Sequence, residues 1–536
     1  MSSNNMKQYK YFSEVEVAAL PAREDIDEKY KWNLTDIYNS DDDWEQDFEW
    51  IENNLSGYIQ YVGKLNTNPE TLLACLKFDD TIGIKLERLY LYAMLAKDGD
   101  MRVNKYQAMD DRIKSLYAKV STESSFIKPE LLEIDDNVLL GMIDSNEELK
   151  VYKHFIENLL RTKLHSLSKP EEHLLALSSE ISQTPYSSYS MFTNADLKFS
   201  TLPDEQGSNV EMSHARFYSA MYSKDRDYRE RAFKSYLAPY KDYVNTFATL
   251  FNGNLKTNIF YAKARKYNSA REASLDRNNI PVQVYNNLVE EVNKNLSPLH
   301  RWAELKKNLL GLDKLKPYDV YVTVFDKATE KKYAYEDAKE IVFQSLEVMG
   351  EDYLSSLRLA FDNRWIDVYE TKAKKSGAYS SGTTFGVHPY VLLNWTDLLN
   401  DVFTLTHEMG HNMHSYYTGK TQPYPYANYS IFLAEVASTF NESLLLDHLT
   451  ENAEDNTEKL YLLEKNLNNI TSTFYRQVMF AEFEMIVYDK TEKGEALTWD
   501  VLCKLYKDIY QKYWGAAMDV NVEEEYTWAR IPHFYY

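Results

Sequence analysis

Residues 396–419 have the sequence TDLLNDVFTLTHEMGHNMHSYYTG, and this segment is the most informative one about the fold. Its apolar side chains recur at helical spacing and mark one buried face. These apolar residues are Leu398, Leu399, Val402, Phe403, Met409 and Met413. Thr396 or Asp397 can cap the N-terminus of a helix, and Gly419 stands where a C-cap glycine would end it. The pattern therefore predicts one helix over this segment.

Two histidines on this predicted helix are spaced to bind a metal ion together. His407 and His411 are four residues apart, so their imidazoles lie on one face, close enough to share a tetrahedral ion. Glu408 is about 100° around the helix from His407, beside the metal rather than on it. From there it can take a proton from a zinc-bound water, whose pKa the metal lowers towards about 7. Gly410 leaves room for another element to pack closely. The spacing predicts a catalytic site with one Zn²⁺ per chain.

A catalytic zinc ion needs a third protein ligand, and two residues compete for this role. His414 continues the stripe of histidines, but it would have to reach past His411. Glu435 lies on a second predicted helix, residues 430–446, where a carboxylate interrupts an apolar run and is costly unless something pairs with it. Small residues around Glu435 would let the two helices approach each other. The sequence favours Glu435.

A second carboxylate on the same predicted helix could support the metal site. Glu442 lies seven residues after Glu435 and shares its face of the helix. From that position it could accept a hydrogen bond from a ligand imidazole and orient the ring. An ordinary salt bridge is an equally good interpretation of Glu442.

The rest of the chain is predicted to be mainly helical. Among 536 residues there are only 16 glycines and 14 prolines, which favours long helices over many short strands and turns. Residues 376–394 are the main exception and predict two short strands around a turn, just before the motif helix. Residues 201–208 contain proline, glycine and polar residues that interrupt helices. They predict a boundary between an N-terminal helical lobe, residues 1–200, and a catalytic domain, residues 201–536.

Charge and composition exclude several classes of partner. The net charge of −22 argues against nucleic-acid binding, because a polyanion repels such a chain. Every window of about 18 residues contains a charge, so we expect no membrane span. The segment Met1–Lys7 lacks the apolar core of a signal peptide. Cys75 and Cys503 are far apart and fit a reducing compartment. We therefore predict a cytoplasmic protein.

Five segments together resemble a known family. They are KWNLTDIY (31–38), KSGAY (375–379), PYVLLN (389–394), TLTHEMGHNMHS (404–415) and AEVASTFNE (434–442). In combination they are similar to oligoendopeptidase F, the bacterial members of the thimet-oligopeptidase group of zinc metallopeptidases. The resemblance covers essentially the whole chain and is far more specific than the short zinc motif.

The resemblance implies a fold and an activity. The fold would be mainly α, a two-lobed, clam-like helical shell around a deep substrate channel, with a small β element beside the zinc-binding helix. The activity would be that of a zinc endopeptidase that hydrolyses internal bonds of short unstructured peptides. We expect the protein to be a monomer. His407, His411 and Glu435 would be the metal ligands and Glu408 the general base.

The resemblance also implies residues that contact the substrate. The strand around Gly377, Ala378 and Tyr379 would pair with the substrate backbone, which explains weak sequence selectivity because main-chain bonds read no side chains. Near the C-terminus, the sequence WARIPHFYY (528–536) matches the family segment that faces the scissile bond. His533 and a nearby tyrosine, Tyr536, would donate hydrogen bonds to the developing oxyanion.

The chain departs from the family pattern at its end. Family members continue into a further helix with more tyrosines, whereas this sequence stops at Tyr536. We therefore expect a truncated domain that lacks some oxyanion donors and exposes apolar surface around Phe534, Tyr535 and Tyr536. This leaves an alternative function open, a peptide-binding relative with weak or no catalysis. A zinc carboxypeptidase with a similar helical channel is a third interpretation of the motif.

Overall fold

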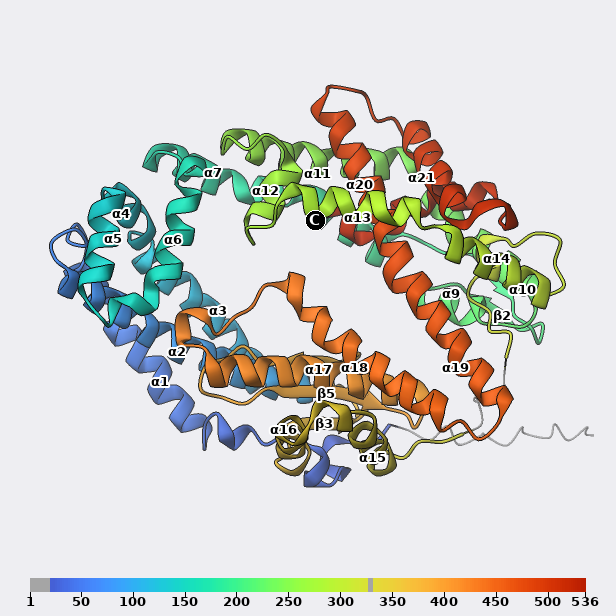
Figure 1. Ribbon diagram of the computed structural model, residues 1–536, viewed down its shortest axis with the longest axis horizontal. Helices are drawn as coiled ribbons and strands as arrows, with labels where there is room; N and C mark the ends of the chain where they lie inside the picture. Colours follow the sequence, from blue (N-terminus) through green and yellow to red (C-terminus); the bar gives the residue numbers. More distant parts are fainter. Residues whose placement is uncertain (1–19, 326–330) are drawn as a thin grey trace, which may run out of the picture. The chain divides into compact units, whose positions relative to one another are not determined.

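The computed structural model describes residues 20–325 and 331–536, which form helices and two small sheets (Figure 1). Contacts divide the chain into two compact units, each built from two separate stretches. The first unit contains Met1–Ile127 and Lys332–Leu445, and the second contains Lys128–Lys331 and Leu446–Tyr536. The predicted division into residues 1–200 and 201–536 follows chain order instead, and it stays a prediction.

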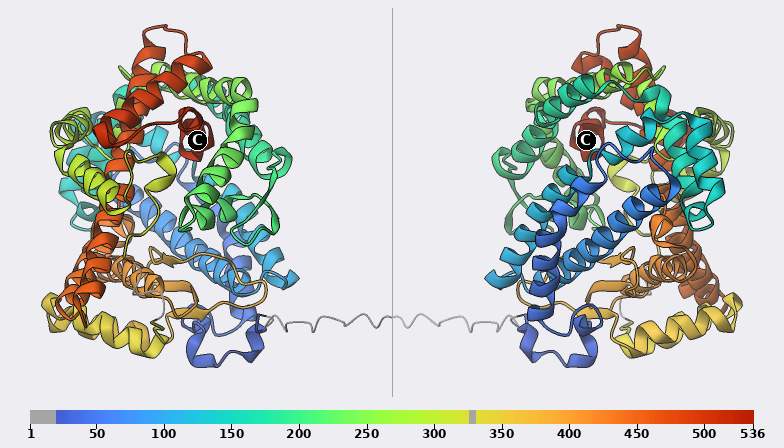
Figure 2. Two further views of the ribbon diagram at one scale, coloured as in Figure 1. Left: turned by 90° about the vertical axis from the view of Figure 1, so that its right-hand side faces the viewer. Right: turned by 90° about the vertical axis from the view of Figure 1, so that its left-hand side faces the viewer.

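The first unit combines long helices with a three-stranded sheet. Its helices are α1 (Asp41–Asn54), α2 (Pro69–Gly99), α3 (Asn104–Ser124), α15 (Tyr335–Ser345), α16 (Glu351–Asp362), α17 (Leu399–Thr421) and the first part of α18 (Ile431–Glu451). Ser40 caps α1 by accepting a hydrogen bond from the backbone N–H of Asp43, and the acidic residues in the first turn suit the positive end of the helix. Helices α1, α2 and α3 pack together (Figure 2).

The sheet of the first unit lies beside the motif helix. Its strands are β3 (Ile366–Tyr369), β4 (Tyr379–Ser381) and β5 (Tyr390–Trp395), in the order β3-β5-β4. The two strands expected within residues 376–394 are confirmed as the antiparallel pair β4 and β5. The parallel pairing of β3 with β5 was not expected, since it joins segments that are not neighbours in the sequence. Helix α17 contacts both β4 and β5.

The predicted motif helix is present as α17, with different ends. Its N-cap is Leu398, and the Asp401 carboxylate accepts hydrogen bonds from the backbone N–H groups of Leu398 and Thr396. The predicted caps, Thr396 and Asp397, are therefore wrong. Gly419 does not end the helix, which continues to Thr421. Pro423 explains the observed end, because it forces the preceding Gln422 into an extended conformation.

The second unit is also helical, with one short hairpin. Its helices are α4 (Ile127–Glu133), α5 (Asp136–Ser145), α6 (Lys153–Arg161), α7 (Lys169–Ser182), α8 (Thr184–Met191), α9 (His214–Met221), α10 (Arg226–Asp242), α11 (Val244–Ala264), α12 (Ala270–Asp276), α13 (Val282–Lys294), α14 (Ser297–Leu309), α19 (Asn456–Asn469), α20 (Arg476–Glu492) and α21 (Trp499–Trp514). The strands β1 (Thr201–Pro203) and β2 (Asn209–Glu211) form an antiparallel hairpin at the predicted breakers.

The end of the chain is part of the core of the second unit. After the 3₁₀ helix η14 (Val522–Arg530), the short helix η15 (Pro532–Tyr535) packs against α8 and α11. Phe534 and Tyr535 are buried, and the Tyr535 ring stacks on Tyr189 at a centroid distance of 3.9 Å. The expectation of exposed apolar surface here is therefore wrong for these two residues, because α8 and α11 cover them. Tyr536 alone of the three is exposed.

Within the described residues, no helix combines the length and the apolar character that crossing a membrane would require.

The prediction of a mainly helical protein with a small sheet beside the motif helix is confirmed. Both cysteines, Cys75 and Cys503, are buried free thiols.

Candidate metal centre

Helices α17 and α18 meet at a glycine. A Cβ atom on Gly410 would lie 2.6 Å from the Cα atom of Ser438 and 2.7 Å from the carbonyl oxygen of Ala437. Both contacts are to backbone, so a side chain at this position cannot be accommodated by a change of rotamer. The expectation that Gly410 leaves room for another element is confirmed, and that element is the helix that carries Glu435.

This close approach brings three potential metal ligands together. The Nε2 atoms of His407 and His411 are 3.2 Å apart, and each lies 3.5 Å from Oε2 of Glu435. The three ligand atoms all lie within 4.8 Å of one another. Nitrogen and oxygen ligands around a tetrahedral Zn²⁺ are separated by about 3.3–3.6 Å, given Zn–ligand bonds of about 2.0–2.2 Å. The donor set and its spacing therefore fit a zinc ion.

The competing ligand, His414, lies outside this cluster. Its ring stacks on Tyr429 at a centroid distance of 3.8 Å, and its buried Nδ1 atom has no hydrogen-bond partner among the described residues. The Tyr429 hydroxyl is in turn 2.9 Å from Oγ of Ser415. His414 thus stacks on an aromatic ring and is not one of the three grouped ligand residues.

Glu442 contacts a histidine of the cluster. Its Oε1 atom lies 2.6 Å from Nδ1 of His407. When Nδ1 donates to this carboxylate, the lone pair is on Nε2, the atom that faces Glu435. Burial works to lower the pKa of His407, but the hydrogen bond and the charge of Glu442 outweigh it and the pKa is raised. Glu442 therefore lies where it could orient the His407 ring, and that role stays a prediction.

Glu408 is buried next to the cluster. Burial raises the pKa of its carboxyl group to about 7, against the lowering effect of the His407 charge. The charge of Glu435 adds to the increase, while a hydrogen bond from the backbone of Ser380 in β4 opposes it. A carboxyl group with a pKa near neutral pH is suited to accept and return a proton.

Strand β4 lies at the edge of its sheet, next to Glu408. Because β5 occupies only one side of β4, the other side has backbone groups that an extended chain can pair with. Gly377, just before the strand, has a φ of +85°, and its carbonyl oxygen accepts a hydrogen bond from Nδ2 of Asn394. Ala378 and Tyr379 follow it and are half-buried.

Sequence reasoning missed the residue that holds this strand in place. The Tyr379 hydroxyl donates to Oδ2 of Asp98 at 2.9 Å, and the Lys375 ammonium lies 3.0 Å from the same oxygen. Asp98 is a buried carboxylate near the end of α2. A charged residue among apolar ones in a long helix was the available signal, but its partner lies 281 residues away in the sequence.

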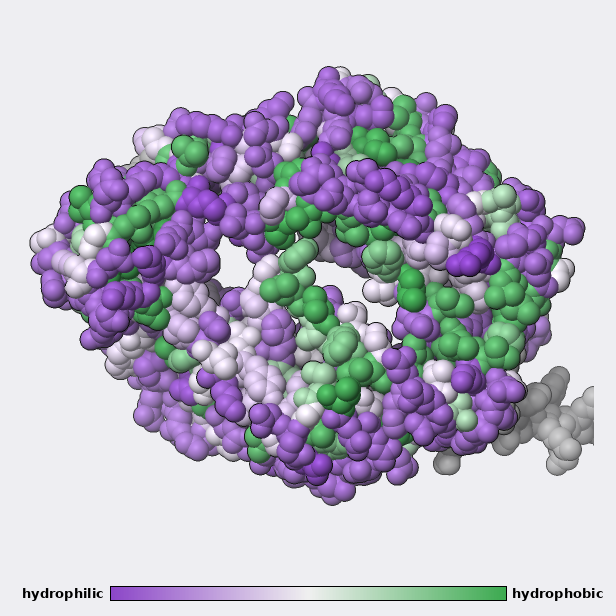
Figure 3. All heavy atoms as spheres, viewed as in Figure 1, coloured by the Kyte–Doolittle hydropathy of each residue, from purple (hydrophilic) through white to green (hydrophobic). Residues whose placement is uncertain are grey.

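The start of α18 exposes a row of apolar side chains in the same unit. They are Ile431, Phe432, Leu433, Val436 and Phe440. Figure 3 shows them as part of a hydrophobic strip along α18. An exposed apolar patch of this kind, next to a cluster of polar groups, is typical of a ligand-binding surface.

The two expected oxyanion donors belong to the second unit. His533 is exposed, and its ring lies 5.4 Å from that of Tyr536. The Tyr536 ring makes an edge-to-face contact with Tyr186 at 5.3 Å. The metal cluster belongs to the first unit, so the roles of His533 and Tyr536 stay predictions.

Comparison with known proteins identifies the family. The model of peptidase family M3 matches residues 219–536, more than half of the chain, and an oligopeptidase F model matches residues 130–199. The chain belongs to peptidase family M3. As a family M3 member it is a metalloendopeptidase that acts on peptides, and the recognised resemblance to oligoendopeptidase F is confirmed.

Its relatives cover nearly all of the chain. Oligopeptidase PepF of Bacillus subtilis is 42% identical over 517 residues, 96% of this chain and 77% of the relative. An oligoendopeptidase F homolog of Lactococcus lactis is 39% identical over 515 residues, 96% of this chain and 85% of the relative. Among solved structures, a peptidase from Chlamydophila abortus is 34% identical with a TM-score of 0.88, covering 96% of this chain and 87% of its own. Oligoendopeptidase-F from Enterococcus faecium is also 34% identical, with a TM-score of 0.69 and coverage of 92% and 84%.

Proposed function

We propose that this family M3 member is a zinc-dependent endopeptidase that hydrolyses internal bonds of short unstructured peptides. The observation that carries the proposal is the convergence of His407, His411 and Glu435 beside the buried carboxyl group of Glu408. Zinc bound by these three residues would supply Lewis-acid chemistry, lowering the pKa of water and polarising the substrate carbonyl.

The protein's own residues position and move the proton. Glu408 accepts a proton from the attacking water and delivers it to the leaving amine, which its pKa near neutral pH permits. Glu442 keeps the Nε2 lone pair of His407 directed at the metal position by accepting the hydrogen bond from Nδ1.

The substrate backbone pairs with the edge of the sheet. A peptide added alongside Gly377, Ala378 and Tyr379 would extend the order β3-β5-β4 by one strand. This pairing places its carbonyl groups near Glu408, since the backbone of Ser380 contacts that carboxylate.

Hydrolysis of an internally quenched fluorescent peptide, with and without a chelator, tests the proposal. We expect turnover that the chelator abolishes and that added Zn²⁺ restores, with one zinc per chain by metal analysis. Mass spectrometry of the products should show cleavage at internal bonds. Release of single C-terminal residues would instead identify a carboxypeptidase. Zinc and peptide binding without turnover would identify the alternative, a peptide-binding relative with weak or no catalysis.

A further inference from the structure

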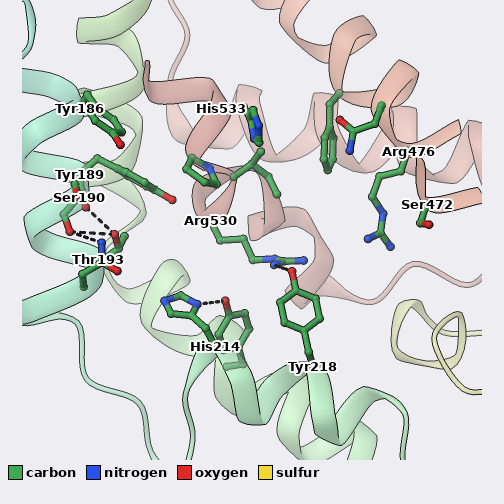
Figure 4. A pocket seen from close by; sticks show the side chains of 16 residues that line it. Tyr186, Tyr189, Ser190, Thr193, His214, Tyr218, Ser472, Arg476, Arg530 and His533 are labelled. Carbon is green, nitrogen blue, oxygen red and sulfur yellow. Dashed lines mark hydrogen bonds between the residues drawn. The ribbon is translucent and has the colours of Figure 1, made fainter. Parts of the chain in front are cut away.

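The second unit contains a cavity lined by two arginines. Its volume is about 420 Å³, and α8, α9, α20 and the segment 530–533 contribute its walls. The lining includes Arg476, Arg530, Tyr218, His214, Tyr186 and Tyr189. Figure 4 shows the guanidinium groups of Arg476 and Arg530 extending towards the same part of the cavity, near the Tyr218 hydroxyl.

Both guanidinium groups have neutral partners. Nη2 of Arg476 donates to the Tyr321 hydroxyl at 3.1 Å, and Nη1 of Arg530 donates to the Tyr218 hydroxyl at 3.3 Å. Arg530 also lies over the rings of Phe217 and Tyr236, and its buried Nε atom has no hydrogen-bond partner in the part of the chain that the structure describes. Within residues 20–325 and 331–536, neither arginine forms an ion pair with a carboxylate.

Another pair of arginines in the same unit, in contrast, shares a carboxylate. Arg226 and Arg229 both donate to the carboxylate of Asp319, at 2.8 and 2.7 Å. An arginine stays charged in proteins, and a buried charge without a counterion is costly. Asp319 provides that counterion for Arg226 and Arg229, whereas Arg476 and Arg530 share a cavity in which an anion can take this place.

A nearby buried acid does not fill this role. Glu524 is within electrostatic range of both arginines, but its carboxyl group accepts a hydrogen bond from Thr527 at 2.9 Å and is not part of the cavity lining. Burial raises the pKa of Glu524 to about 7, although the charges of Arg530 and Arg476 act to lower it. Glu524 therefore compensates the positive charges of Arg476 and Arg530 only in part.

We propose that this cavity binds the C-terminal carboxylate of a short peptide, with Arg476 and Arg530 as charged donors and the Tyr218 hydroxyl as a neutral donor. Guanidinium groups match carboxylates in geometry and form strong charge-assisted hydrogen bonds. The rings of Tyr186, Tyr189 and Phe480 line the same cavity and offer an apolar surface for the terminal side chain. The choice of a peptide ligand rests on the proposed function, because peptides are the substrates that supply such a carboxylate.

Calorimetry on the full chain, stripped of metal by a chelator and dialysed, tests the proposal independently of catalysis. The probes are two acetylated tripeptides, Ac-Ala-Ala-Phe as the free acid and as the C-terminal amide, whose only difference is the carboxylate. We expect the free acid to bind about 10- to 100-fold more tightly, the range for a hydrogen-bonded charged group. Equal affinities would overturn the proposal, whether or not the zinc-loaded enzyme hydrolyses peptides.

Substitutions of the two arginines test whether these residues cause the preference for the free acid. Arg476→Gln should reduce the ratio of acid to amide affinity towards one, and Arg530→Lys, which keeps the charge but loses the fork of donors, should reduce it in part. Arg301→Gln in α14 replaces an exposed arginine of the same unit and should leave the ratio unchanged. Thermal melting followed by circular dichroism identifies any variant that fails to fold. In that case the other arginine variant and the comparison of acid with amide still show whether the cavity binds the carboxylate.

Inorganic phosphate separates a peptide site from a general anion site. Phosphate should compete only weakly with the free-acid tripeptide, because it lacks the apolar side chain. Phosphate binding as tight as that of the tripeptide would replace the peptide assignment with a general oxyanion site. A preference for the free acid that persists in both arginine variants would place the carboxylate elsewhere and overturn the proposal.

Discussion

Glu408 and the metal ligands have separable roles at the scale of single residues. Glu408 lies beside the cluster, and its carboxyl oxygens are not among the three grouped ligand atoms. The Glu408→Gln variant should lose about 10²–10⁴-fold in turnover, the range for a general base, and keep one zinc per chain. Peptide hydrolysis and metal analysis of the same preparation measure both effects. Loss of zinc from a folded Glu408→Gln chain would make Glu408 a ligand.

The third ligand can be tested by comparing two residues near His411. Glu435→Ala should release zinc, because it removes the carboxylate that lies 3.5 Å from both histidines. His414→Ala should retain stoichiometric zinc, since its ring stacks on Tyr429 instead. Metal analysis after dialysis against a weak chelator distinguishes the two. The reverse pattern would move the ligand to His414 and require a different site.

At the scale of elements, the site depends on how closely α17 and α18 approach. Gly410→Ala places a Cβ atom 2.6 Å from the backbone of Ser438, so the helices must separate and move Glu435 away from the histidines. We expect lower stability and weaker zinc binding. Gly419→Ala is the matched control on α17, because nothing lies within 4 Å of its added Cβ and alanine favours helix by about 0.5–1 kcal/mol.

Melting temperature and zinc affinity, measured for both glycine variants, check this prediction. Gly419→Ala should be as stable as the parent or slightly more so, with unchanged zinc affinity. Equal zinc affinity in Gly410→Ala and Gly419→Ala would show that the helix contact does not position Glu435.

At the scale of the whole molecule, buried ion pairs make stability depend on pH. Burial works to raise the pKa of Asp319, but hydrogen bonds from Arg226 and Arg229 outweigh it and leave the pKa below its usual value of 3.8. A carboxylate with a lowered folded-state pKa stabilises the protein above about pH 4, and this contribution is lost as the pH falls through the folded-state pKa. Asp319→Asn should therefore be less stable at pH 7, by about 3–5 kcal/mol, and should lose less further stability below pH 4.

Urea unfolding midpoints at pH 7 and pH 3 measure this effect, with Asp313→Asn as the control for an exposed carboxylate in the same unit. Midpoints are the suitable quantity, since a chain of two units need not unfold in one step. An Asp319→Asn chain with the same pH dependence as the parent would contradict the assignment of acid sensitivity to this carboxylate.

Features that depend on local spacing could be predicted from the amino-acid sequence. The helical period puts His407 and His411 on one face and Glu408 beside them, and no other part of the chain is needed for that inference. The same holds for the pair of strands before the motif helix and for the mainly helical character. Resemblance across the five segments added the family.

Tertiary packing settles which distant residues meet, a question that local spacing leaves open. Backbone contact at Gly410 brings Glu435, which the sequence had favoured as the third ligand, and Glu442 to the histidines. Asp98, which the sequence had not indicated, reaches Tyr379 from another helix. The two compact units each combine separate stretches of the chain. Arg476 and Arg530 line one cavity although they are 54 positions apart in the sequence. Such contacts form when apolar faces pack, and packing depends on the shapes of whole elements rather than on residue order. For this reason the spacing of residues along the chain indicates the chemistry of the site, while the fold determines which distant residues come into contact.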